Sequence, residues 1–369
     1  MLGISIYPDK ENHQQTIEYI KLAARLGFKR VFTCLLSINK DSPEVVKNQL
    51  QSLIGVARRY DMEVLIDVAP SVFEALKIKI DDLQFFADLG VTGIRLDEGF
   101  NGYKEALMTH NPYGLDIEIN MSNGTKQIDN ILSYNANKKR IIACHNFYPM
   151  AHSGLTLEHF IKTSLHFKKL GIRSAAFVSS KAADHGPWTV MDDGLPTLEM
   201  HRHLPILTQV KHLLLLDLVD DIIIGNAFAS KAELKAISEL QMPVFDVEPL
   251  TNLNALEKQI LFQENHANRG DLNPYMVRSS VSRIKFADAK IPANNDLNKF
   301  NPGEIIICND KYLQYKGELQ IIKQTHSDQE QRKNVVAKIV DHELFLLEYL
   351  KPWISFKLRL TPNSLKKVN

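Results

Sequence analysis

Residues 115–121 of the chain read LDIEINM, and this stretch is central to predicting the fold. Successive side chains of a β-strand point to opposite faces, so Asp116, Glu118 and Asn120 share one face while the aliphatic residues share the other. In a parallel barrel the surrounding helices cover the outer side of each strand, which must therefore be apolar. The polar side of this strand is then expected to face the barrel interior.

Apolar runs of this kind recur about eight times before residue 250, and longer amphipathic stretches separate them. Several of those stretches end at glycine, as helices often do, for example at Leu26-Gly27 and Leu170-Gly171. This alternation predicts a (β/α)₈ barrel of the TIM type. A doubly wound open sheet is the alternative, although no G-x-G-x-x-G follows the first run. The expected strands are 3–7, 30–36, 63–69, 93–97, 115–121, 141–148, 174–179 and 221–225.

The pattern changes near residue 250. Residues 251–273 are polar, and turn-forming groups such as Asn301-Pro302-Gly303 then separate short alternating runs. We therefore expect a barrel domain over residues 1–250 and a smaller, mostly-β domain over residues 251–369. The expected strands of the second domain are 276–284, 304–308, 319–323, 335–340 and 356–360.

The composition is that of an ordinary globular protein, with 44 Lys+Arg and 43 Asp+Glu among 369 residues. A formal charge of +1 argues against broad nucleic-acid binding through phosphates. No apolar run reaches the roughly 18 residues that span a bilayer, and Met1–Tyr7 lacks the basic segment of a signal peptide. The cysteines Cys34, Cys144 and Cys308 lie far apart in apolar contexts, which indicates reduced core thiols in a cytoplasmic protein.

Three carboxylates are candidates for catalysis at the barrel mouth, where TIM-barrel active sites lie. Asp97 ends the fourth expected strand, Glu118 lies on the fifth, and Glu199 lies in the long loop after the seventh. Two carboxylates on either side of a sugar bond are what glycoside hydrolysis needs. The structural alternatives are an ion-paired interior layer in which Arg95 neutralises Asp116, and a capped helix start at Glu199.

Polar and aromatic side chains gather near the same strand ends, where they would contact a ligand. A histidine in such a place is equally compatible with a hydrogen-bonded structural role. No zinc-binding H-E-x-x-H, nucleophile elbow or P-loop occurs, so we expect neither a metal nor a cofactor. The candidate substrate-binding residues of the first domain are Tyr7, Asn120, His145, Asn146, Tyr148, Trp188, His201, Arg202 and Asn226.

Several longer motifs are specific in combination: RLDEGF at 95–100, EINMS at 118–122, CHNFYP at 144–149, GLPTLEMHR at 194–202, IIGNA at 223–227, YMVRS at 275–279 and YKGEL at 315–319. Together they resemble the 6-phospho-N-acetylmuramidase family over nearly the whole chain. The resemblance implies a TIM barrel followed by a cyclophilin-like domain, and a glycosidase of bacterial cell-wall recycling. Its substrate would be N-acetylmuramic acid 6-phosphate linked β-1,4 to N-acetylglucosamine.

Such a substrate carries a phosphate and a lactyl carboxylate, so cations must meet it. Arg278, with Arg283 beside it, and Arg269 are the candidates in the second domain. We expect this domain to cover the barrel mouth and to supply Arg278, and Arg269 as a second cation. The alternative is an arginine on a surface strand that pairs with a neighbouring acid.

Two other functions stay open at this point. A barrel aldolase or sugar-phosphate isomerase would need a Schiff-base lysine or a metal cluster, and Lys181 is the nearest such lysine. A non-enzymatic carbohydrate-binding or prolyl-isomerase-like protein would leave the carboxylates of the barrel unexplained.

Overall fold

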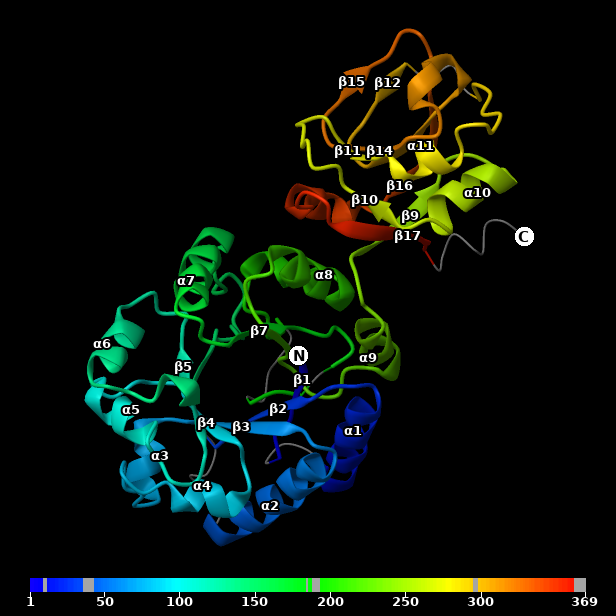
Figure 1. Cartoon of the computed structure of the whole chain (residues 1–369). Helices are drawn as coiled ribbons and strands as arrows, with labels where there is room; N and C mark the ends of the chain where they lie inside the picture. The colour runs from blue at the N-terminus through cyan, green and yellow to red at the C-terminus, as the bar shows by residue number, and fades with distance from the viewer. Residues whose placement is uncertain (9–11, 36–42, 184, 188–192, 295–297, 362–369) are drawn as a thin grey trace. The chain divides into compact units, whose positions relative to one another are not determined.

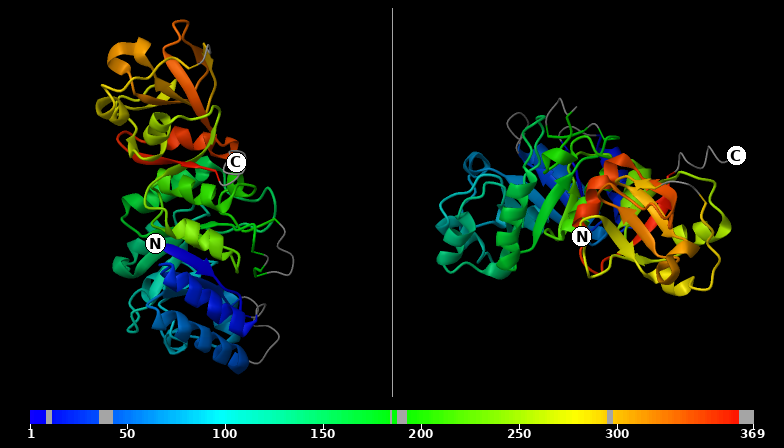
Figure 2. Two further views of the ribbon diagram at one scale, coloured as in Figure 1. Left: turned by 90° about the vertical axis from the view of Figure 1, so that its right-hand side faces the viewer. Right: turned by 90° about the horizontal axis from the view of Figure 1, so that it is seen from above.

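The chain folds into two compact units, which Figures 1 and 2 show from three sides. The computed structural model describes residues 1–8, 12–35, 43–183, 185–187, 193–294 and 298–361. The first unit comprises Met1–Leu213 and Asp217–Glu239, and the second comprises Leu214–Leu216 and Leu240–Asn369. Among the described residues, no helix is both long enough and apolar enough to cross a membrane.

The first unit is a closed barrel of parallel strands that follow one another in chain order. The barrel closes because β1 pairs with β8, with Leu2 opposite Ile222. This topology confirms the predicted (β/α)₈ barrel, and each observed strand overlaps one expected run. The strands are β1 (Leu2–Ser5), β2 (Arg30–Cys34), β3 (Glu63–Val68), β4 (Gly93–Leu96), β5 (Asp116–Asn120), β6 (Ile141–Cys144), β7 (Ser174–Val178) and β8 (Asp221–Ile224).

Helices surround these strands, and local sequence signals set several of their ends. The side chain of Asn12 caps the first helix by accepting from the backbone N–H groups of the first turn. A capping box of Ser230 and Glu233 begins the last one, and Gly90 ends α4 in the left-handed conformation. The helices are α1 (His13–Arg25), α2 (Pro43–Arg59), α3 (Pro70–Ala75), α4 (Gln84–Leu89), α5 (Tyr103–Met108), α6 (Gln127–Ser133), α7 (Leu157–Lys169), α8 (Ile206–Leu216) and α9 (Lys231–Ser238), with 3₁₀ turns η1 (Lys138–Arg140) and η2 (Glu199–His201).

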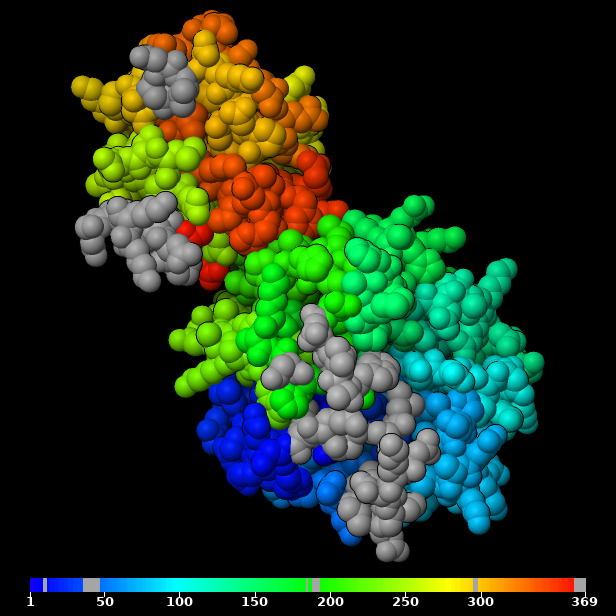
Figure 3. All heavy atoms as spheres, turned by 180° about the vertical axis from the view of Figure 1, so that it is seen from behind, coloured from blue at the N-terminus to red at the C-terminus, as the bar shows by residue number. Residues whose placement is uncertain are grey.

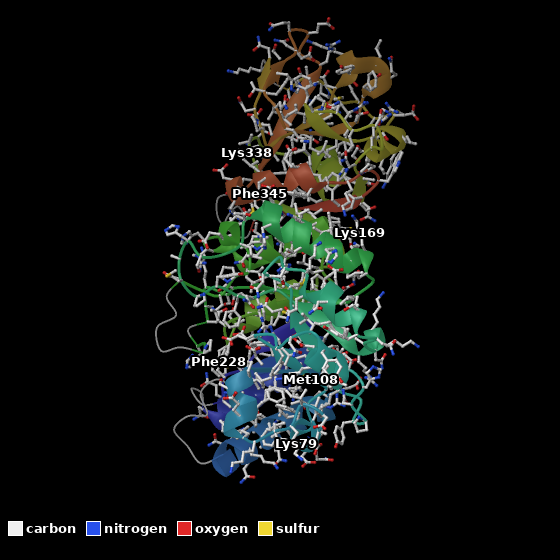
Figure 4. All side chains as sticks on the ribbon, turned by 90° about the vertical axis from the view of Figure 1, so that its left-hand side faces the viewer. Lys79, Met108, Lys169, Phe228, Lys338 and Phe345 are labelled. Carbon is white, nitrogen blue, oxygen red and sulfur yellow. The ribbon has the colours of Figure 1, made fainter. Side chains whose placement is uncertain are left out.

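An aromatic and aliphatic cluster fills part of the barrel interior. The rings of Phe32 and Phe177 meet edge to face with centroids 5.2 Å apart. Phe228, labelled in Figure 4, is partly buried against this cluster. Cys34 and Cys144 belong to it, and all three cysteines of the chain are buried and form no disulfide. The charged side chains of the barrel interior form two groups, each around one arginine, which are described below.

The second unit is mostly β, as expected. Its main sheet has the strand order β10-β17-β9-β16-β13-β14-β11, and β12 pairs with β15. The two edge strands approach each other, since the N–H of Arg269 donates to the carbonyl of Arg278 at 3.0 Å, so the sheet is nearly closed. The elements are β9 (Val244–Pro249), α10 (Ala255–Phe262), β10 (His266–Ala267), β11 (Met276–Ser279), α11 (Val281–Lys285), β12 (Lys299–Phe300), β13 (Glu304–Cys308), η3 (Asp310–Tyr315), β14 (Leu319–Ile322), β15 (His326–Ser327), β16 (Lys333–Ile339), η4 (Asp341–Tyr349) and β17 (Ser355–Leu360).

Two expectations about the second unit need correction. The unit begins at Leu240, before the expected boundary near residue 250, because β9 pairs with β16 and β17 in the second sheet. The expected strand 276–284 is too long. The backbone of Ser280 turns into the helical region (φ −86°, ψ −3°), so β11 ends at Ser279 and Arg283 lies on helix α11.

Candidate active site

The mouth of the barrel holds an arginine between two carboxylates. The Nη1 atom of Arg95 on β4 donates to Asp67 at 2.6 Å and to Asp97 at 3.1 Å. Asp67 is the residue before the last of β3, and Asp97 directly follows β4. The side chains of Arg95 and Asp67 are 3% and 4% exposed, whereas that of Asp97 is 38% exposed. This Arg95 cluster (Asp67, Arg95 and Asp97) therefore has one enclosed acid and one that reaches solvent.

Amide side chains frame the same cluster. Nη2 of Arg95 donates to Oδ1 of Asn146, which follows β6. Nδ2 of Asn120, the last residue of β5, donates to the carbonyl of Asp97 at 3.1 Å. Four consecutive strands thus bring polar side chains to one place, and three of the sequence candidates, Asp97, Asn120 and Asn146, are among them. Figure 3 shows one face of this unit, where blue, cyan and green segments come together around the barrel.

Tyr148 lies near these amides and is half-buried. Burial raises the pKa of its phenol, against the hydrogen bond with Ser122 and the positive charge of Arg95. The hydroxyl of Ser122 also accepts from the backbone N–H of Asn146 at 2.7 Å. Tyr148 therefore lies close enough to Arg95 for the charge of that arginine to act on its phenol.

Asp67 is the titratable group that the sequence did not single out. Burial raises its pKa to about 7, opposed by Arg95, and the negative charge of Asp97 raises it further. A carboxyl group with such a pKa is partly protonated at neutral pH, so it can donate a proton as a general acid does. The available signal was a lone acid near the end of the apolar run EVLIDVA at 63–69.

Glu118 lies in a different cluster and corrects one prediction. Nη2 of Arg30 donates to Glu118, and Nη1 donates to Asp221 at 2.7 Å. We call these three residues the Arg30 cluster, and each of their side chains is at most 1% exposed. Arg30 and Asp221 begin β2 and β8, so the cluster lies toward the amino-terminal end of the barrel. Glu118 is a wholly buried partner of Arg30 on the side of the barrel away from the mouth, so it is not placed to act on a sugar bound there.

The sequence alternative that Arg95 neutralises Asp116 is also wrong. Asp116 binds Arg140, whose Nη1 lies 3.2 Å from its Oδ1. Both side chains are partly exposed, because Asp116 is the first residue of β5 and lies at the amino-terminal rim. Arg95 is two residues further along its own strand than Gly93, the residue that pairs with Asp116, so it reaches toward the mouth.

Glu199 ties loops together and is not placed as a catalytic acid. Its two carboxylate oxygens accept from the backbone N–H groups of His152 and Gly154 at 3.0 and 2.7 Å. Arg202 donates to both oxygens, at 2.7 and 2.6 Å. These bonds, that of Arg202 above all, lower the pKa of Glu199 to about 2. Such a carboxyl group has no proton to donate at neutral pH, and Arg202 is occupied by the same contact, so neither prediction is supported.

Tyr7 and Asn226 are enclosed by the barrel rather than open to a ligand. Tyr7 is wholly buried, and its hydroxyl donates to the carbonyl of Gly225. Asn226 is 2% exposed, and its amide bonds both the N–H and the carbonyl of Ser180 at 2.9 and 2.7 Å. Both residues hold strand ends in place, which corrects their assignment to substrate binding.

The two histidine candidates are buried and neutral. His145 lies between the hydroxyls of Ser122 and Ser164 at 3.2 and 2.9 Å, and burial lowers its pKa to about 3. His201 bonds His212 at 2.8 Å, and burial lowers its pKa as well. These are the hydrogen-bonded structural histidines that the sequence left as the alternative. Trp188 lies outside the described residues.

Arg269 and Arg278 belong to the second unit, where each pairs with an acid. Arg278 donates to Glu318 at 2.7 and 3.1 Å, and Arg269 donates to Asp271 at 2.7 and 2.8 Å. Lys181, the Schiff-base candidate of the aldolase alternative, donates to the carbonyl of His203 at 2.6 Å and is exposed. The described part of the chain contains no group of three or more metal-ligating side chains.

A closed (β/α)₈ barrel with polar and charged side chains at its mouth is the architecture of a TIM-barrel enzyme. The sequence model "6-phospho-N-acetylmuramidase, N-terminal" matches residues 2–239, and "6-phospho-N-acetylmuramidase, C-terminal" matches residues 243–359. The chain therefore belongs to the 6-phospho-N-acetylmuramidase family and is a glycosidase.

Two solved structures resemble the whole chain. An uncharacterized Bacillus cereus protein is 45% identical, with a TM-score of 0.89 over 97% of this chain and 99% of that chain. A conserved Enterococcus faecalis protein of unknown function is 27% identical, with a TM-score of 0.75 over 100% and 99%. The comparison with curated proteins found no match. The two-unit architecture is thus shared over the full length.

Proposed function

We propose that the barrel mouth hydrolyses the β-1,4 bond between N-acetylmuramic acid 6-phosphate and N-acetylglucosamine, with Asp97 and Asp67 as the carboxylate pair. Membership of the family supports a phosphorylated muramyl sugar as the substrate. The observation that carries the choice of residues is the Arg95 cluster, in which a proton-holding acid and a solvent-reaching carboxylate share one nitrogen.

Asp67 is the general acid in this proposal. It protonates the oxygen of the leaving N-acetylglucosamine while the bond from that oxygen to the anomeric carbon breaks. Asp97 attacks the anomeric carbon and forms a glycosyl ester. Water then attacks the same carbon, releases Asp97 and gives its proton to Asp67, which restores the starting state. Arg95 holds both carboxyl groups in place through Nη1.

The geometry favours a retaining reaction. The accepting oxygens of Asp67 and Asp97 lie 2.6 and 3.1 Å from the same nitrogen, Nη1 of Arg95. The distance between the two oxygens is therefore at most the sum of these two distances. Retaining glycosidases have carboxyl groups roughly 5–5.5 Å apart, whereas inverting ones need roughly 6.5–9.5 Å to accommodate water. We therefore expect the released N-acetylmuramic acid 6-phosphate to keep its β configuration at first, which NMR of the fresh product can detect.

Two conservative variants test the proposal. Asp97→Asn and Asp67→Asn each keep the side-chain size but remove the attacking charge or the proton. We expect each to lower the release of N-acetylglucosamine from the phosphorylated disaccharide about 10²–10⁴-fold. Asp116→Asn is the matched control, because Asp116 lies at the other end of the barrel. Activity of both test variants close to that of Asp116→Asn would contradict the assignment.

We infer in addition that the enzyme works in the cytoplasm as part of cell-wall recycling. The three cysteines are buried and form no disulfide, which supports a reducing compartment. Fractionation of cells that express the chain, followed by the disaccharide assay on each fraction, tests this. Activity recovered mainly outside the cytoplasmic fraction would overturn it.

A further inference from the structure

A pocket of about 440 Å³ lies within the second unit. Its lining includes Arg278, Gln320 and Lys333, together with the rings of Tyr312 and Tyr315. Every one of these residues belongs to the second unit, so the pocket is formed by this unit alone. The barrel reaction described above uses none of them.

The pocket continues an otherwise apolar face of the second sheet. Arg278 on β11 lies directly opposite Gln320 on β14, so the two side chains share a face, and Figure 1 shows the two strands side by side. Ile306 pairs with Gln320 and with Val335, and these aliphatic residues pack with Phe300 in a small core. A cation and an amide beside such a core need partners, because buried polar groups are unfavourable without them.

Gln320 has one such group without a partner. The residue is 5% exposed, and its Nε2 donates to Oε1 of Glu318 at 3.0 Å. A carboxylate only accepts, so this bond fixes the amide with its oxygen turned away from Glu318. Within the described ranges, no group donates to that buried oxygen. The buried amide oxygen of this pocket-lining residue therefore lacks an O–H or N–H donor.

Positive charge exceeds negative charge around the same pocket. Glu318 is wholly buried, and both Arg278 and Arg283 pair with it. Each of these two guanidinium groups also lies over the ring of Tyr315, at 5.7 and 5.5 Å from its centroid. Two cations against one carboxylate leave a net positive charge that a bound anion would balance.

Lys333 adds a third cation. It is 5% exposed, and its Nζ lies 3.1 Å from Nε2 of His326. Burial lowers the pKa of Lys333, because an enclosed ammonium group loses its hydration, and the nearby acids Asp328 and Glu318 offset this only in part. An anion in the pocket would compensate for that loss. Asp271 also lines the pocket, but its charge is already balanced by Arg269.

We propose that this pocket binds a small anionic sugar, a sugar phosphate or a sugar acid. The phosphate or carboxylate would meet Arg278 and Lys333, and a hydroxyl would donate to the free amide oxygen of Gln320. The aromatic rings of Tyr312 and Tyr315, which line the pocket, would add apolar contacts with the sugar. A phosphate group and a carboxylate group can both bind these cations. The titration described below distinguishes a sugar phosphate from a sugar acid.

Isothermal titration of the full-length protein with four probes tests the proposal. Glucose 6-phosphate represents the phosphate source, glucuronate the carboxylate source, glucose the neutral ring, and inorganic phosphate the ion alone. We expect at least one charged sugar to bind ten or more times more tightly than both glucose and inorganic phosphate. Equal binding of charged and neutral sugars would overturn the proposal, and so would phosphate binding as tightly as its sugar ester.

Variants of two pocket residues test whether the sugar binds in this pocket. Lys333→Met and Gln320→Leu should each weaken the tighter charged sugar tenfold or more, because one removes the cation and the other the acceptor. Lys338→Met is the matched control. Lys338, labelled in Figure 4, lies on the same strand as Lys333 but does not line the pocket. Its Nζ lies 2.7 Å from the carboxylate of Asp341. Binding that survives both pocket variants would lie elsewhere, the barrel included, and would contradict the proposal.

Gln320→Glu keeps the test decisive if the other two variants fold poorly. It preserves the size of the side chain and adds a negative charge beside the anion, so it should also abolish tight binding. Melting curves of all variants verify folding. Unchanged affinity in a folded Gln320→Glu protein would overturn the assignment. Hydrolysis of the disaccharide by the same variants is a separate readout, so failure of this proposal is distinguishable from failure of the barrel mechanism.

Discussion

Arg30 and Arg95 each lie between two carboxylates inside the same barrel, and their surroundings differ. The Arg30 cluster is enclosed on all sides, with both acids at most 1% exposed. The Arg95 cluster lies at the mouth, where Asp97 is 38% exposed. The residue types of the two clusters are nearly the same, so composition does not distinguish the structural cluster from the candidate reaction centre.

The number of cations distinguishes Asp221 of the Arg30 cluster from Asp67 of the Arg95 cluster. Burial opposes ionisation of Asp221, but Arg30 at 2.7 Å and Arg173 at 2.6 Å outweigh it, and the pKa of Asp221 is lowered. Asp67 has Arg95 alone and shares it with a second acid, so burial prevails and its pKa rises to about 7. Sharing one arginine thus leaves Asp67 able to exchange a proton near neutral pH, whereas Asp221, which binds two arginines, stays ionised.

The largest expected effect is on folding, from Arg30→Met. Removing Arg30 leaves Glu118 without its cation in a closed interior, which should destabilise the protein by about 3–5 kcal/mol. Denaturant unfolding monitored by circular dichroism measures the loss. The double variant Arg30→Met/Glu118→Gln should recover part of it, because the uncompensated charge is gone. Unchanged stability of the Arg30→Met variant would contradict the structural role of the Arg30 cluster.

The next effect is on activity, from Arg95→Met. We expect kcat/KM to fall about 10²–10³-fold, as for loss of one donor that positions reacting groups. The loss of stability should be smaller than for Arg30→Met, since Asp97 is hydrated and Asp67 can take up a proton. Activity assays and unfolding curves on the same preparation compare the two. A larger loss of stability than for Arg30→Met would contradict the view that Arg30 contributes more to stability than Arg95 does.

A pH profile sharpens the comparison further. If Asp67 is the general acid, kcat/KM should fall as the pH rises through about 7, where the carboxyl group loses its proton. Asp97→Asn removes a negative charge that raises the pKa of Asp67, so that pKa should move down. Titration of the Asp67 carboxyl by ¹³C NMR, assigned with Asp67→Asn, measures the shift. No movement in Asp97→Asn would contradict coupling within the Arg95 cluster.

The same pKa has a consequence for stability. Because folded Asp67 holds its proton to a higher pH than unfolded Asp67, stability should fall between about pH 4 and pH 7 through this group. Asp67→Asn should remove that part of the pH dependence. Unfolding free energies of both proteins at pH 5 and pH 8 test the sign, and an identical difference in the two proteins would contradict it.

The smallest expected effect comes from Asp116→Asn. Its bond to Arg140 is partly exposed and screened by water, so the change in stability should stay within about 0–1 kcal/mol. Activity should be unchanged. A large loss of stability or of activity in Asp116→Asn would mean that the amino-terminal rim affects the barrel mouth, and it would contradict the separation of the two ends.

The alternation of apolar and polar residues was enough to predict the barrel. Each run could be recognised locally, because a strand face is determined by residues two apart. The same rule placed Asp97 and Asn120 at strand ends, and both lie at the mouth. It failed for Glu118, which shares a strand face with Asn120 but lies deeper, and for Asp67, whose strand looks almost wholly apolar.

Where a strand alternates in polarity, as β5 does, the amino-acid pattern is sufficient to predict which residues face the barrel interior, since that depends on strand periodicity. Only the tertiary structure decided which cation meets which acid. Arg30 is 88 residues from Glu118 and 191 from Asp221, and these contacts follow from the stagger and tilt of strands around a closed sheet. Exposure and pKa depend on those distant partners, so the choice between a structural ion pair and a proton donor is made by the assembled barrel.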